Sequence, residues 1–122
     1  MALIGRFIGV NRYSDPNIRD LSGAGRDALA LWALFGDTVP DMDAKLISGT
    51  DATFATIRTA IQDTLQNATP EDTVILFFSG HGSQDHRLAA FDTQLSDLAN
   101  TTVPMQEIAD LFKNSLASPF YG

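Results

Sequence analysis

The feature that most constrains the fold is the segment Thr73–Phe78, in which five consecutive residues are apolar. A strand with one solvated face would alternate polar and apolar side chains, so an unbroken run indicates a strand covered on both faces. Such strands are typical of parallel sheets that carry helices on both sides. The run therefore predicts an α/β fold.

Two more apolar runs, Leu3–Val10 and Ala44–Ser48, predict further strands of the same sheet. The segments between the strands have apolar residues at helical spacing. Ser22 is expected to cap a helix that ends at Gly36, and a second helix is expected to start near Thr53. The aligned apolar side chains are Ala24, Ala28, Leu31, Trp32 and Phe35 in the first helix, and Phe54, Ile57, Ile61 and Leu65 in the second.

The chain beyond Phe78 is polar and rich in turns, with a short strand or hairpin arm expected at Leu88–Phe91. A last helix is expected from about Pro104, a residue tolerated in the first turn. Its buried side would carry Ile108, Leu111, Phe112 and Leu116. Residues 1–122 thus predict one domain with the order β-α-β-α-β-(hairpin)-α.

Charge and composition narrow the possible functions. The formal net charge of -7 argues against a nucleic-acid or anionic-membrane surface, since both need basic residues. The sequence contains no cysteine, which excludes disulfides and thiolate metal sites within these residues. No apolar run is long enough to span a bilayer. The first ten residues read as a buried strand with Arg6 in its middle, not as a signal peptide, so a cytoplasmic location is expected.

The most informative segment for chemistry is Ser79-Gly80-His81-Gly82, directly after the apolar strand. Functional groups of α/β sheets collect at the carboxyl ends of the strands. His81 could act there as a general base and acid, and the Gly82 N–H could donate to a developing oxyanion. The alternative is that the glycines only form a turn and that His81 is a partly exposed loop residue.

Three blocks of the sequence resemble the caspase and metacaspase superfamily of cysteine peptidases. They are Phe7-Ile-Gly-Val-Asn-Arg-Tyr13, Leu21-Ser-Gly-Ala-Gly-Arg-Asp-Ala-Leu29 and Phe77-Phe-Ser-Gly-His-Gly82. They are similar to the opening strand, the start of the first helix and the block that carries the catalytic histidine. The resemblance implies a three-layer α/β/α sandwich of caspase-haemoglobinase type with a mainly parallel sheet. These residues form its N-terminal portion, in which the strand order is expected to be 2-1-3.

The resemblance also implies a Cys–His dyad with His81 as its histidine and the Gly82 N–H in the oxyanion hole. The nucleophilic cysteine of that superfamily ends the next strand, which is missing here, so the sheet is expected to be incomplete. We expect an apolar strand ending in cysteine downstream of Gly122, from the same protein or a partner. The parent would be a cysteine endopeptidase, with a bacterial stress, cell-death or defence role as one setting. A non-catalytic caspase-like interaction module is the alternative.

The expected partner is a protein or peptide substrate, and Asp20 is the candidate for its recognition. True caspases hold an acidic P1 side chain with an arginine before the first helix, where this sequence has Leu21. Metacaspase-like relatives use acidic residues to hold Arg or Lys at P1. Asp20 could take that role, although an exposed carboxylate before a helix more often faces water.

Other patterns point to weaker alternatives. Gly23–Ala28 fits the loose dinucleotide pattern G-x-G-x-x-G/A, which would make the chain a nucleotide-binding domain. A nucleotide site needs these glycines directly after the first strand, however, and here the polar segment Asn11–Ser22 lies between the strand and the glycines. His81, Asp85 and His86 make a poor metal site, and no cofactor is expected. Asp92 and Asp97 could help to bind calcium, which some metacaspase-like enzymes need.

The predicted sheet has one further consequence. Without a fourth strand, Thr73–Phe78 would be an unprotected apolar edge, and Phe112 or Leu116 of the last helix would be left bare. The chain by itself is therefore expected to associate with a second copy or with a partner segment.

Overall fold

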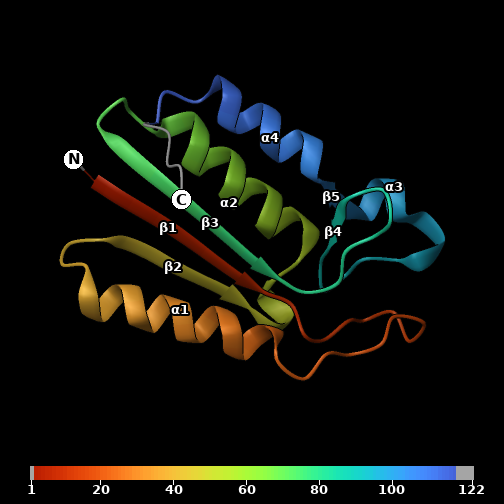
Figure 1. The fold of residues 1–122 in the computed structure, drawn as a ribbon. Coiled ribbons are helices and arrows are strands. Elements are labelled where there is room, and N and C mark those ends of the chain that lie inside the picture. The colour runs from red at the N-terminus through yellow and green to blue at the C-terminus, as the bar shows by residue number, and fades with distance from the viewer. Residues whose placement is uncertain (1, 118–122) are drawn as a thin grey trace.

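The computed structural model describes residues 2–117, which form a three-layer α/β/α arrangement (Figure 1). The main strands are β1 (Ala2–Gly9), β2 (Asp43–Ser48) and β3 (Asp72–Ser79), and the long helices are α1 (Ala24–Thr38), α2 (Phe54–Asn67) and α4 (Met105–Asn114). Short elements are the 3-10 turns Gly49–Asp51 and Leu95–Asp97, the strands β4 (Arg87–Ala89) and β5 (Thr102–Pro104), and helix α3 (Leu98–Thr101). None of the helices in this part of the chain combines the length and hydropathy that a bilayer span requires.

The central sheet is parallel, with the order β2-β1-β3, which confirms the predicted topology. Strand β1 pairs with β2 from Ile4↔Asp43 to Gly9↔Ser48, and with β3 from Ala2↔Asp72 to Gly9↔Ser79. Helix α1 covers one face of the sheet, and α2 and α4 lie on the other (Figure 1). The antiparallel pair β4–β5 and helix α3 lie beyond the carboxyl ends of the three strands.

The main core lies between the sheet and helices α2 and α4. Ile57, Ile61 and Leu65 of α2 are almost fully buried there, as their spacing predicted. Thr53 caps this helix by accepting a hydrogen bond from the Thr56 N–H at 3.2 Å. On the other face, Phe7 packs against Phe35 of α1 with ring centroids 5.5 Å apart.

Three local expectations for α1 are wrong. The N-cap residue is Gly23, without a side-chain cap, instead of Ser22. The helix continues through Gly36 to Thr38, because a glycine in an exposed helix costs only about 1 kcal/mol and does not end the helix by itself. Trp32 is 38% exposed and not a core residue, and its indole N–H donates to the Ala44 carbonyl at 3.2 Å.

Strand β1 also buries a charge that the apolar pattern did not account for. Arg6 is 7% exposed, and its guanidinium donates to the Gly5 and Asp43 carbonyls at 2.9 Å and to the Asp43 carboxylate at 3.2 Å. A buried guanidinium is tolerated when its donors are used in this way. The interaction ties β1 to the start of β2.

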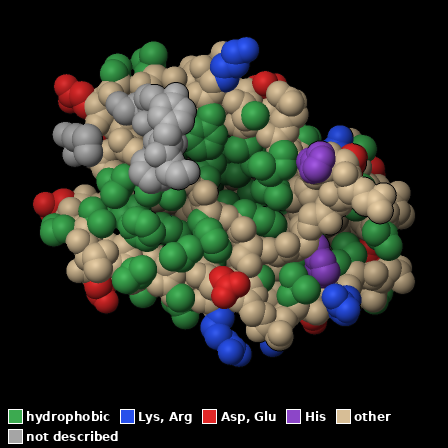
Figure 2. Space-filling model, in the orientation of Figure 1, with side chains coloured by type: hydrophobic (Ala, Val, Ile, Leu, Met, Phe, Trp, Pro, Cys, Tyr) green, Lys and Arg blue, Asp and Glu red, His purple; other side chains and the backbone are tan. Residues whose placement is uncertain are grey.

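One edge of β3 is unpaired in the described part of the chain, as expected. Beside it lies an apolar groove of about 360 Å³, which we call the β3–α4 groove. It is lined by Ile8, Ile61, Leu76, Phe77, Phe78, Leu88, Met105, Ile108 and Phe112. Figure 2 shows a broad hydrophobic area across the middle of the molecule. Ile108 is buried as predicted. Phe112 is 39% exposed, and Leu116 is 67% exposed beyond the end of α4, so both are left bare as expected for a sheet without a fourth strand, although helical spacing had placed them on the buried side of the helix.

We predict that a polypeptide of these 122 residues self-associates at micromolar concentration, because an apolar edge strand beside an open groove is a template for pairing. The measurement is sedimentation velocity over a concentration series. Phe112→Ser, inside the groove, should weaken the association, whereas Leu34→Ser, at an exposed position of α1, should not. A monomer whose β3 amides are protected from exchange would contradict this prediction.

Candidate active site

The candidate site lies where β1 and β3 end side by side. The pairing of these strands continues past Gly9↔Ser79, with the Val10 N–H donating to the Ser79 carbonyl at 2.9 Å. Gly80 follows at a point of close approach: a Cβ there would meet the Phe78 ring at 2.9 Å and the Val10 carbonyl at 3.0 Å. Only glycine fits without a shift, and the chain then turns out of the sheet at His81.

His81 is partly buried and is held at both ends. Its backbone N–H donates to the Tyr13 hydroxyl at 2.9 Å, and its Nε2 lies 2.7 Å from the Arg19 carbonyl oxygen. A carbonyl can only accept, so Nε2 carries the proton in this hydrogen bond. In a neutral imidazole, Nδ1 is then the basic nitrogen, available to take a proton from a reacting group.

Gly82 presents an unused backbone donor next to this histidine. The neighbouring backbone groups are paired: the Ala89 N–H donates to the His81 carbonyl at 3.0 Å, and the Ser83 N–H donates to the Arg87 carbonyl at 2.9 Å. Among residues 2–117, the Gly82 N–H has no hydrogen-bond partner. Such an N–H can stabilise a developing oxyanion.

His81 and Gly82 line one cavity of about 400 Å³. Its walls come from residues 17–19, 81–89 and 93–102, and include Arg19, Arg87 and the apolar side chains of Ile18, Leu95 and Leu98. Among the described residues, no Asp or Glu contributes to the lining, so Asp85 and Asp97, which lie within these segments, stay outside it, although the chain as a whole is strongly acidic. The immediate surroundings of His81 are thus less acidic than the rest of the protein.

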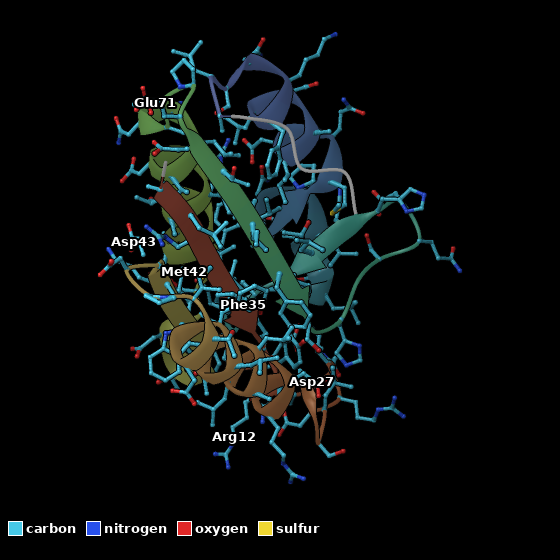
Figure 3. All side chains as sticks on the ribbon, turned by 60° about the vertical axis from the view of Figure 1, so that its left-hand side comes forward. Arg12, Asp27, Phe35, Met42, Asp43 and Glu71 are labelled. Carbon is cyan, nitrogen blue, oxygen red and sulfur yellow. The ribbon has the colours of Figure 1, made fainter. Side chains whose placement is uncertain are left out.

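Asp20 lies outside the lining of this cavity. It is exposed, and its Oδ1 accepts the Tyr13 N–H at 3.1 Å. A second carboxylate, which the sequence analysis did not single out, lies at the same end of the sheet: Asp27 accepts a hydrogen bond from the Ser79 hydroxyl at 3.5 Å. Figure 3 shows Asp27 at the start of α1. The sequence signal that could have identified Asp27 is its position in the first turn of a predicted helix that follows a strand end.

Asp15 is another residue that the sequence analysis did not single out. It is 6% exposed, and its two oxygens accept the Leu95 N–H at 2.7 Å and the Asn17 N–H at 2.9 Å. These hydrogen bonds, led by that from Leu95, lower the pKa of the Asp15 carboxyl below its ordinary value. Asp15 therefore ties the loop after β1 to the segment before α3, and both segments contribute residues to the lining of the cavity.

The structure separates the residues of the weaker alternatives. Gly23 and Gly25 lie at the start of α1, with a loop between them and β1, and Gly25 lies close to the Asn11 side chain, where a Cβ would meet Oδ1 at 3.0 Å. This close packing gives a structural reason for a glycine at position 25. The two histidines form separate patches on the surface in Figure 2, and residues 2–117 contain no group of three metal-ligating side chains.

The aspartates considered for calcium make hydrogen bonds within the protein. Asp92 Oδ1 accepts the Phe54 N–H at 2.7 Å at the start of α2, and Asp97 Oδ1 accepts from the Asn100 side chain at 3.1 Å. Calcium binding by these residues stays a prediction.

The family model of the caspase domain (peptidase C14) matches residues 1–119, nearly the whole chain. The chain belongs to the caspase-domain family. No curated protein matches the sequence. Membership in this family confirms the resemblance to the caspase and metacaspase superfamily, and the mainly parallel α/β sheet is compatible with it.

The Asp15 hydrogen bonds predict a pH-dependent contribution to stability. Because the pKa is lowered in the folded state, the contribution is full above the unfolded value of about 4 and is lost as the pH falls through the lower folded value. The difference in unfolding free energy between the wild type and Asp15→Asn should be constant from pH 8 to about 5 and shrink below about 4. Urea unfolding across this range measures it. Asp63→Asn, at an exposed position of α2, is the control, and an equal pH dependence in both variants would contradict the assignment.

Proposed function

We propose that this chain provides the general base and the oxyanion donor of a cysteine endopeptidase. The observation that carries the proposal is the setting of His81: Nε2 is bound to the Arg19 carbonyl, Nδ1 is left as the basic nitrogen, and the free Gly82 N–H lies next along the chain. Both groups line the same cavity at the carboxyl end of β3. Membership in the caspase-domain family supports a peptidase role for this arrangement.

The reaction follows from these groups. His81 Nδ1 takes the proton of a cysteine thiol, and the thiolate attacks the carbonyl carbon of the scissile peptide bond. The carbonyl oxygen becomes an oxyanion and accepts the Gly82 N–H. His81 then gives its proton to the departing amine, and a thioester links the substrate to the enzyme. Water, deprotonated by His81, hydrolyses the thioester and restores the thiol.

The thiol must come from outside these 122 residues, which contain no cysteine. The proposed source is a further strand added to the unpaired edge of β3, from the same protein or a partner. Two features support this: among residues 2–117 no strand pairs with the outer edge of β3, and the described residues that line the β3–α4 groove beside it all have apolar side chains. A parallel strand there would end next to Ser79, on the same edge of the sheet as His81.

In the full-length protein, His81→Ala should lower kcat/KM for peptide cleavage by a factor of about 10²–10⁴, the usual contribution of a general acid–base group. The fold should be retained, because the side chain lies in a loop at the sheet end. Circular dichroism and peptide hydrolysis measure the two effects.

His86→Ala is the matched control, since His86 is exposed and five residues along the same loop. Its activity should equal that of the wild type. Activity within tenfold of the wild type in His81→Ala would leave a non-catalytic interaction module as the better interpretation.

We further propose that acidic side chains at the carboxyl end of the sheet favour Arg or Lys at P1. Asp20 and Asp27 are exposed there, and Asp20 Oδ2 has no hydrogen-bond partner among the described residues. Asp20→Asn keeps an oxygen for the Tyr13 N–H but removes the charge. It should lower kcat/KM by about fivefold for a peptide with Arg at P1, the effect of an exposed ion pair. A peptide with Gln at P1 is the control, and equal losses on both peptides would rule out this role.

A further inference from the structure

Tyr13 contacts His81 through both its ring and its hydroxyl group. It lies in the loop after β1 and is 8% exposed. Its ring packs against the imidazole with centroids 5.1 Å apart and planes tilted by 48°. Its hydroxyl makes two hydrogen bonds at 2.9 Å, donating to the Val10 carbonyl and accepting the His81 N–H. One buried hydroxyl thus connects the exit of β1 to the backbone of the histidine.

Tyr13 also acts on the other end of the imidazole. Its backbone N–H donates to Asp20 Oδ1 at 3.1 Å, and the Leu21 N–H donates to the Asn11 carbonyl at 2.8 Å. These two hydrogen bonds close the base of the loop that contains Arg19, whose carbonyl accepts from His81 Nε2. The loop therefore holds the carbonyl in the place where it selects the tautomer of His81.

We propose that Tyr13 is a positioning residue for His81. Through its hydroxyl and its ring it fixes the backbone and the plane of the imidazole so that Nδ1 faces the reacting thiol. The inference rests on the proposed function of His81 and assigns a role to a residue that would not itself touch the substrate. The alternative is that Tyr13 only fills space in the core.

The chemistry of the hydroxyl suits this role. Burial, the largest effect, raises the pKa of Tyr13 above its ordinary value of 10.0. The hydroxyl stays protonated through the pH range in which an imidazole transfers protons, so it can donate to Val10 and accept from His81 throughout. Phenylalanine would keep the ring contact and remove only the two hydrogen bonds.

The experiment compares Tyr13→Phe with the wild type in the full-length protein. We expect kcat to fall about 10- to 100-fold, since a misplacement of about 1 Å can cost about 100-fold, while KM stays within about twofold. The amide of His81 should also exchange faster with solvent deuterium, because it loses its acceptor.

Ser115→Ala is the matched control. The Ser115 hydroxyl likewise donates to a carbonyl, that of Leu65 at 2.8 Å, and accepts a backbone N–H, that of Ala117 at 3.2 Å, but it does not contact His81. It should leave kcat unchanged even if it lowers the melting temperature. A general loss of stability can thus be told apart from a loss of positioning.

The outcomes separate this inference from the proposed function. Tyr13→Phe with kcat within twofold of the wild type, in a protein that His81→Ala inactivates, overturns the positioning role alone. Equal falls of kcat in Tyr13→Phe and Ser115→Ala also overturn it, because the effect would then be one of stability. Full activity in His81→Ala overturns both proposals. If Tyr13→Phe does not fold, Tyr13→Trp provides the second test. Tryptophan keeps an aromatic ring and an N–H donor but has no acceptor for the His81 N–H. An unchanged kcat in Tyr13→Trp would also contradict the positioning role.

Discussion

The structure depends on the pairing of β1 with β3. These strands are separated by more than sixty residues of sequence, yet they run parallel in register until Gly9 lies opposite Ser79, and Val10 adds one more hydrogen bond. Because the pairing continues to the last residue of both strands, the two loops leave the sheet at the same level. Tyr13 from one loop and His81 from the other are brought into contact in this way. A slip of one residue would turn each side chain to the opposite face and separate the two rings.

Small residues make this meeting possible. Gly80 lets the chain pass close to the Val10 carbonyl, and Gly9 lets α1 approach β1, since a Cβ there would lie 2.6 Å from the Ala24 carbonyl. Each glycine costs backbone entropy on folding, which the closer packing of the layers offsets. The region around His81 is therefore held by close backbone contacts and by the hydrogen bonds of His81 to Tyr13 and Arg19. This is the kind of support that a catalytic group needs for a fixed orientation.

Charge is distributed unevenly around the site. The cavity next to His81 has Arg19 and Arg87 in its walls, whereas Asp20 and Asp27 lie outside it at the same end of the sheet. Arg87 is held by Asp85, whose carboxylate accepts from its Nε at 3.0 Å. Asp15 is turned inwards to backbone N–H groups and joins two walls of the cavity. The acidic composition of the chain therefore says little about the field at the imidazole, which depends on the few groups that face it.

The sequence alone determined the class of fold and the catalytic candidates. The apolar run Thr73–Phe78 specified a strand between two layers, and helical spacing placed α2. The Ser-Gly-His-Gly segment marked the end of β3. These features could be predicted because each of the signals depends only on residues that are neighbours in the sequence. Where the outcome depended on distant partners, the sequence was insufficient. Tertiary contacts decided where α1 ends, how exposed Trp32 is, and that Arg6 and Asp15 are buried. The hydrogen bonds of His81 to Tyr13 and Arg19 were likewise set by tertiary structure, because they join segments more than sixty residues apart that only the register of the sheet aligns.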